Sequence, residues 1–230
     1  SFAYLEISAD KWSFSSELIL SLALGISFYN KTFDSCNHFS QKKHSRSEVW
    51  DGSSEKPNIY LYPEETTQVH VTIKPNGKIT QSDPEYNSGW DVQIEPNGMI
   101  EDKYTFLFYE ADVKYTIPDK GWNVKSTNLE SFLEKTLTKY GLCTQEIADF
   151  LEYWTERLPE SSHYLIYPFA NDELENICPI SINPKPDNIL RLWFLFEPAQ
   201  SATGIRNPVI PKFDRTGFDV VEWGGILKDE

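Results

Sequence analysis

Carboxylates that lie beside aromatic residues are the side chains in this sequence best suited to chemistry. Glu110 follows Tyr109, and Glu222 precedes Trp223, each within a strongly apolar phrase. Glycoside hydrolases use two carboxyl groups, one with its pKa raised by apolar surroundings. Glu110 and Glu222 are therefore the candidate catalytic pair if the protein is a hydrolase. The opposing interpretation is that each carboxylate is solvated or pairs with a Lys or Arg, because spacing along the chain does not fix their separation in space.

Aromatic residues beside predicted turns are the candidate ligand-binding residues. Trp90, Trp122 and Trp223 each adjoin a glycine, and loops often carry binding surfaces. Together with Tyr109 they could stack on sugar rings or on a peptide. The alternative is that these rings pack in the core, which is the commoner role of aromatic residues.

The sequence contains no P-loop, dinucleotide fingerprint, metalloprotease, serine-hydrolase or EF-hand pattern, so we expect no cofactor. We also expect no metal site, because Cys36, Cys143 and Cys178 form no C-x-x-C and no Cys/His cluster. A bridge between Cys143 and Cys178 and three reduced thiols are both compatible with this spacing.

Charge and hydropathy narrow the range of partners. The formal net charge is −14 at pH 7, which argues against binding to nucleic acid or to anionic lipid. The longest apolar run, 18–28, has 11 residues and is too short to span a bilayer. It is either a targeting remnant or a packed element. A glycan or a protein remains as the expected partner, and nothing in the sequence sets the oligomeric state.

A polar boundary divides the chain into two parts. Residues 34–56 are Ser-rich and lack an apolar period, so we assign 1–55 to an N-terminal segment with a linker and 56–230 to the main domain. The main domain opens with "KPNIYLYPEE" (56–65). There Ile59 and Leu61 fall on one strand face and Tyr60 and Tyr62 on the other, which predicts an entry strand covered on both sides.

Further strands are predicted at 104–117, 163–169, 178–186, 189–198 and 217–230 from their apolar runs. "VTIKPNGKI" (71–79) matches "VQIEPNGMI" (92–100) at a shift of 21 residues. This internal echo predicts two successive β-hairpins, each turning at a Pro-Asn-Gly triplet.

Helical periodicity appears only between these two groups of strands. Thr127 and Glu130 match a capping box, and Gly141 is placed to end the first helix. Thr144 is placed to cap a second helix, which Pro159 closes. We therefore predict an α+β fold: a β-rich, mainly antiparallel sheet or sandwich with an inserted antiparallel helical pair at about 127–158.

Three phrases together resemble an uncharacterised family of microbial proteins: "KPNIYLYPEE" at 56–65, "YNSGWDVQIEPNGMI" at 86–100 and "GFDVVEWGG" at 217–225. The resemblance covers roughly 56–225 and implies an exported or surface-attached protein, hence an extracytoplasmic setting. It implies no activity, so it carries over no catalytic residue. This chain departs from the pattern at Asn58, where Val is expected, and at Tyr109, where Trp is common.

Three functional hypotheses follow from the sequence. The leading one is an exported or surface-associated, non-enzymatic domain that recognises glycan or protein through aromatic loops. The second is a carboxylate-dependent glycan hydrolase that uses Glu110 and Glu222. The third is a structural subunit of a larger assembly, docked by residues 1–55.

Overall fold

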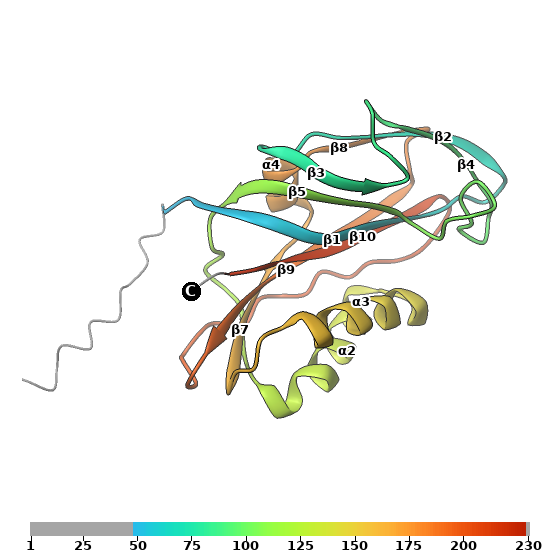
Figure 1. The fold of residues 1–230 in the computed structure, drawn as a ribbon. Coiled ribbons are helices and arrows are strands. Elements are labelled where there is room, and N and C mark those ends of the chain that lie inside the picture. Colours follow the sequence, from blue (N-terminus) through green and yellow to red (C-terminus); the bar gives the residue numbers. More distant parts are fainter. Residues whose placement is uncertain (1–47, 229–230) are drawn as a thin grey trace, which may run out of the picture. The chain divides into compact units, whose positions relative to one another are not determined.

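The computed structural model describes residues 48–228, which form a β-sandwich with a helical layer on one face (Figure 1). The large sheet has the strand order β3-β5-β1-β10-β9-β7-β6, and the small sheet has the order β4-β2-β8. The strands of the large sheet are β1 (Trp50–Tyr62), β3 (Lys78–Asp83), β5 (Leu107–Tyr115), β6 (Trp122–Lys125), β7 (His163–Phe169), β9 (Asn188–Ala199) and β10 (Asp219–Leu227). The remaining elements are β2 (Thr67–Ile73), β4 (Trp90–Ile94), β8 (Ile180–Asn183), η1 (Ser126–Asn128), α2 (Leu129–Tyr140), α3 (Thr144–Arg157) and α4 (Asn171–Ile177).

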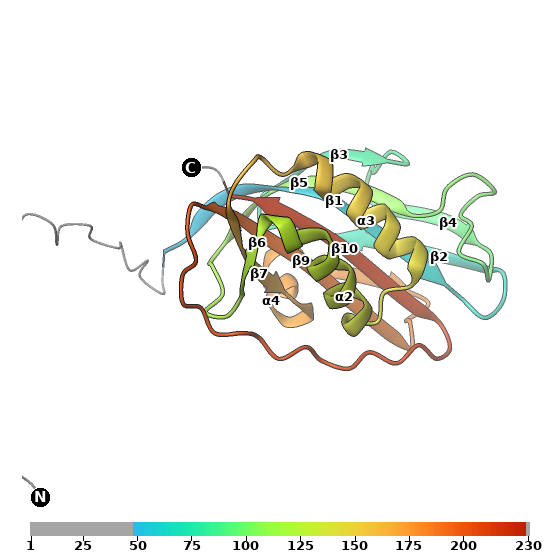
Figure 2. The ribbon, with the colours of Figure 1, turned by 90° about the horizontal axis from the view of Figure 1, so that it is seen from below.

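Two hydrophobic cores lie on the two faces of the large sheet. One core fills the space between the large sheet, the small sheet and α4, and the other lies between the large sheet and the pair α2–α3. Figure 2 shows α2 and α3 crossing the sheet on this second face. The predicted α+β fold with an inserted helical pair is therefore confirmed. All strand pairs are antiparallel except β9–β10, which is parallel.

Strand β1 shows the two-faced pattern that its sequence predicts. Ile59 and Leu61 belong to the core between the sheets, and Tyr60 belongs to the core beneath the helices. Pro63, which has no N–H for a ladder, follows the last residue of the strand. Such a strand needs cover on both sides, which the small sheet and the helices supply.

The main domain begins earlier than the sequence indicated. β1 starts at Trp50, inside the segment assigned to the linker, and residues 50–54 pair with β5. The register shifts between Ser54 and Asn58, where Lys56 has a φ of 56°. The bulge interrupts the alternation of side chains between the two faces of the strand, so the sequence pattern does not indicate that β1 begins before it. The N-terminal run 18–28, the sequence around Cys36 and the docking arm proposed for 1–55 up to residue 47 lie outside the described residues.

The helical pair begins slightly later than predicted. Thr127 lies in the 3₁₀ turn η1, and α2 starts at Leu129 without a side-chain cap, so the capping box expected at Thr127 is wrong. Gly141 ends α2 with a φ of 97°, as predicted for a left-handed cap. Helix α3 starts at Thr144, and its N-cap is Cys143, whose backbone N–H donates to Glu146 Oε2 at 2.8 Å.

The internal echo does not form two hairpins. β2 belongs to the small sheet and β3 to the large sheet, so the turn at 74–77 crosses between the sheets. The two copies instead pair with each other, since Val71 faces Trp90 and Val69 faces Val92 across β2 and β4. The matching phrases therefore do not adopt matching structures: β3 pairs with β5 in the large sheet, whereas the end of the second copy forms isolated bridges at Ile100.

Candidate functional site

The carboxylate of Glu222 is buried between the two sheets and accepts from three side-chain donors. It is fully buried and pairs with the Nε of Arg191, which is directly opposite on the parallel strand β9. The Tyr109 hydroxyl donates to Glu222 Oε1 at 2.6 Å, and Trp193 Nε1 donates to the same oxygen at 3.3 Å. Burial raises the pKa of Tyr109, and the neighbouring Glu222 raises it further, so the hydroxyl keeps its proton.

This cluster holds the sandwich together rather than presenting a reactive group to solvent. Arg191 Nη2 donates to the Cys178 carbonyl at 2.7 Å, which ties the end of α4 to the sheet. The carboxylate accepts hydrogen bonds from three donors. These hydrogen bonds offset more of the free-energy cost of desolvating the ion pair than the charge pairing alone would. Glu222 is therefore a structural anchor between β10, β9 and β5.

Glu110 lies on the opposite face of the large sheet. Ile59 of β1 pairs with both Leu107 and Glu222, so Leu107 and Tyr109 share the face of Glu222, and Glu110 points to the helices. The predicted catalytic pair of Glu110 and Glu222 is therefore wrong, because the thickness of the sheet separates the two carboxyl groups.

Glu110 instead belongs to a charged cluster at the β1 bulge. Burial raises its pKa, and the nearby carboxylate of Glu55 raises it further. Glu55 accepts hydrogen bonds from Arg157 Nε at 2.6 Å and from the Tyr153 hydroxyl at 3.0 Å, both from α3. Lys56 Nζ lies 4.8 Å from the centroid of the Phe108 ring. The cluster fastens α3 to the bulged strand.

The four aromatic residues predicted to bind ligand are all buried. The exposed fractions are 3% for Trp90, 8% for Trp122, and 0% for Trp223 and Tyr109. Each ring lies in a strand or at its end rather than on a loop, and Trp90 Nε1 donates to the Pro84 carbonyl at 2.8 Å. The glycine beside each tryptophan is closely packed, since an added Cβ would lie 3.0 Å or less from a neighbouring atom. The predicted surface platform is wrong, because all four rings are buried.

The two tyrosines of the opening phrase connect β1 to α3. The Tyr60 hydroxyl donates to Asp149 Oδ2 at 2.7 Å, and the Tyr62 hydroxyl donates to Glu146 Oε1 at 2.8 Å. Tyr60 and Tyr62 are two residues apart on one face of the strand, and Glu146 and Asp149 are three residues apart on one face of the helix. Both tyrosines can therefore reach α3 at the same time. Arg215 completes the contact, since its Nη2 donates to Glu146 at 2.5 Å.

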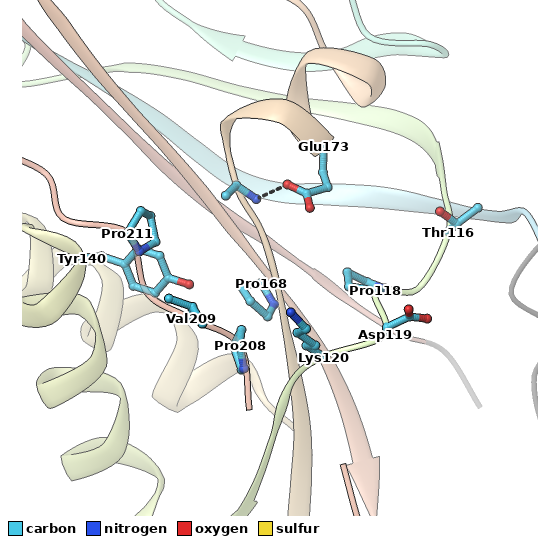
Figure 3. Close-up of a pocket in the computed structure, with 11 residues that line it drawn as sticks. Thr116, Pro118, Asp119, Lys120, Tyr140, Pro168, Glu173, Pro208, Val209 and Pro211 are labelled. Atoms are coloured by element: carbon cyan, nitrogen blue, oxygen red, sulfur yellow. Dashed lines mark hydrogen bonds between the residues drawn. The ribbon is translucent and has the colours of Figure 1, made fainter. Parts of the chain in front are cut away.

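A hollow lies at the end of the sandwich where α2, β7 and α4 meet the loop after β5. It has a volume of about 410 Å³. Figure 3 shows Tyr140, Pro208, Val209 and Pro211 on one side and the Thr116–Lys120 loop on the other. Glu173 of α4 lies over it and accepts a hydrogen bond from the Ala170 backbone N–H at 3.2 Å.

A second hollow of about 300 Å³ adjoins the first, because Thr116 and Glu173 line both. Within residues 48–228, the large hydrophobic residues that are exposed are Val49, at 63%, and Val209, at 83%. Each lines one of the two hollows. The two exposed valines therefore both lie at these adjoining hollows.

Sequence reasoning missed Arg191, Glu146 and Arg215. For Arg191 a signal existed: it is the one charge inside "ILRLWFLF", and Glu222 is the one charge inside "VVEWGG". Two lone opposite charges in the two most apolar strands predict that these strands are neighbours. The hollow carried no comparable signal, because its lining comes from four separate stretches of the chain.

The fold and these contacts define a β-rich α+β domain with a buried Glu–Arg pair at its centre. No family model and no solved structure matches the chain. A Butyrivibrio fibrisolvens protein, described as an uncharacterised protein in the bglA 3′ region, is 36% identical over 72 residues. The match covers 29% of this chain and 75% of that protein. The chain belongs to the family of this uncharacterised protein.

Among residues 48–228, no helix has the length and apolarity needed to cross a membrane. Cys143 and Cys178 are both free thiols, so the bridge between them that the sequence allowed does not form. The resemblance drawn from the "KPNIYLYPEE" and "VVEWGG" phrases stays a prediction.

Proposed function

We propose that this chain is a non-enzymatic, exported or surface-associated binding domain that holds a polypeptide segment of a partner in the two adjoining hollows. The observation that carries the proposal is the exposure of Val209 beside the larger hollow. Apolar surface that is contiguous with a hollow and rimmed by polar residues is a feature of protein-interaction sites. The exported setting rests on the family resemblance.

The lining of the larger hollow favours a polypeptide over a sugar. Its apolar walls are aliphatic, made by four prolines and a valine. Its one aromatic ring, Tyr140, is 1% exposed and so has no free face for a sugar ring. Thr116, Asp119, Lys120 and Glu173 add a polar margin with charges of both signs, which suits the mixed groups of a peptide.

A selection experiment tests the proposal. The full chain would be used to select binders from a displayed peptide library, and each binder would be measured against Val209→Asp. We expect the substitution to weaken binding at least tenfold, because it places a charge where the partner buries apolar surface. Gln68→Asp is the matched control, since Gln68 is an exposed residue of β2 in the small sheet.

Two results would overturn the proposal. One is a set of selected peptides that bind Val209→Asp as tightly as the parent chain. The other is a glycan array on which the full chain binds a sugar and keeps that binding in Val209→Asp. The second result would move the function to a sugar site elsewhere on the surface.

A further inference from the structure

Tyr140 places a polar atom in the larger hollow. This residue ends α2 and lines the hollow, yet its exposed fraction is only 1%. Figure 3 shows its hydroxyl directed away from α2 and into the hollow. Within residues 48–228 no hydrogen bond involves this hydroxyl. The polar tip of a buried tyrosine normally has a hydrogen-bond partner, so the hollow is where that partner would come from.

Glu173 is the charged residue that acts on this hydroxyl. Its Oε2 accepts the Ala170 backbone N–H at 3.2 Å, and its Oε1 has no hydrogen-bond partner within the described part of the chain. Burial raises the pKa of Tyr140, and the charge of Glu173 raises it further. The carboxylate and the hydroxyl therefore lie near each other at one hollow without bonding to each other. A group that donates hydrogen bonds to both oxygens fits between them.

The walls of the hollow suit a long aliphatic chain. They are formed by four prolines and one valine: Pro118, Pro168, Pro208, Val209 and Pro211. Lysine and arginine side chains bury their aliphatic stems along such apolar surface and keep the charged end at a polar group. The combination of apolar walls with a carboxylate and a hydroxyl therefore matches a side chain that is aliphatic along its length and cationic at its tip.

We propose that the larger hollow receives a lysine or arginine side chain of the partner, whose cation donates hydrogen bonds to Glu173 Oε1 and to the Tyr140 hydroxyl. The inference rests on the proposed function, because it names the residue by which the bound polypeptide is recognised. Lys120 also lines the hollow, but among residues 48–228 it forms no ion pair with Glu173. The formal net charge of −14 likewise favours a cationic partner.

The test uses the peptides that the full chain selects from the displayed library. Each peptide is also synthesised with its lysine or arginine replaced by norleucine, which keeps an aliphatic stem and removes the cation. We expect peptides that depend on Val209 to share a basic residue at one position. Its replacement by norleucine, or Glu173→Gln in the chain, should weaken binding roughly tenfold or more, because either change removes a charge-assisted hydrogen bond.

Matched variants separate recognition from folding. Glu173→Gln keeps an oxygen that can accept the Ala170 N–H, and Asp172→Asn is the control, because it removes a carboxylate from an exposed position of the same helix that does not line the hollow. Asp172→Asn should bind like the parent chain. Tyr140→Phe, which keeps the ring, should weaken binding about three- to tenfold. The norleucine peptide should bind Glu173→Gln and the parent chain equally, because both changes remove the same contact.

The outcomes distinguish this inference from the proposed function. Selected peptides that lose binding in Val209→Asp, but bind Glu173→Gln as tightly as the parent chain, overturn the inference and leave polypeptide binding in place. Selected peptides without a shared basic residue have the same meaning. Selected peptides that bind Val209→Asp as tightly as the parent chain overturn the proposed function, and the inference with it.

Discussion

Arg191→Met is the substitution for which the structure gives the firmest expectation. It removes the guanidinium and keeps a long apolar stem, so the Glu222 carboxylate stays buried with only the Tyr109 and Trp193 donors. Leaving one member of a buried ion pair uncompensated costs about 3–5 kcal/mol. For a domain of this size each kcal/mol lowers the melting temperature by roughly 2–4 °C. We therefore expect a drop of about 6–20 °C in thermal unfolding followed by circular dichroism.

A matched control separates burial from charge. Arg157→Met also breaks an Arg–Glu pair, but the Arg157 side chain is 55% exposed, whereas that of Arg191 is 2% exposed. An exposed pair contributes at most about 1 kcal/mol. Equal effects of the two substitutions would refute the reasoning, as would an Arg191→Met chain that melts within about 2 °C of the parent, roughly 1 kcal/mol. Replacing Arg191 and Glu222 together by leucine should recover only part of the loss, because no charge is then buried alone but Tyr109 and Trp193 lose their acceptor.

Three further predictions concern other parts of the fold. Glu110→Gln should raise the melting temperature at pH 7, and this gain should disappear as the pH falls toward 4.5. The reason is that a carboxyl group whose pKa is raised in the folded state destabilises that state only above its unfolded pKa, here 4.5. A gain in melting temperature that grows on acidification would contradict this. Gly225→Ala should lower the free energy of unfolding in urea by about 1–3 kcal/mol, because the new Cβ would lie 2.8 Å from the Phe194 carbonyl oxygen and closer still to the Trp154 indole of α3. Gly204→Ala is the control and should change this free energy little, because nothing lies within 4 Å of its new Cβ. Tyr62→Phe should lower the free energy of unfolding by about 1.5–3 kcal/mol, because it removes a hydrogen bond to a buried carboxylate; an unchanged urea midpoint would show that the hydroxyl contributes nothing.

Local patterns in the sequence were enough to predict the elements. The alternation of Ile59 and Leu61 with Tyr60 and Tyr62 predicted a strand covered on both faces, and Gly141 predicted the end of α2. These features depend on a few neighbouring residues and on the fixed periods of strands and helices, so they hold in any context. The start of β1 was not predicted, because the bulge interrupts the two-residue period of the strand.

Tertiary structure alone decided what each candidate residue does. Glu110 and Glu222 lie in strands as predicted, yet the register through Ile59 places them on opposite faces. Trp90 and Trp223 adjoin glycines as turn residues often do, yet packing buries both rings. The sequence by itself determined which residues form strands and helices and which faces are apolar, because those properties are local. Which charges meet, which rings stay accessible and where a hollow opens depended on pairings between segments far apart in the chain, and those pairings are set by the packing of the whole domain.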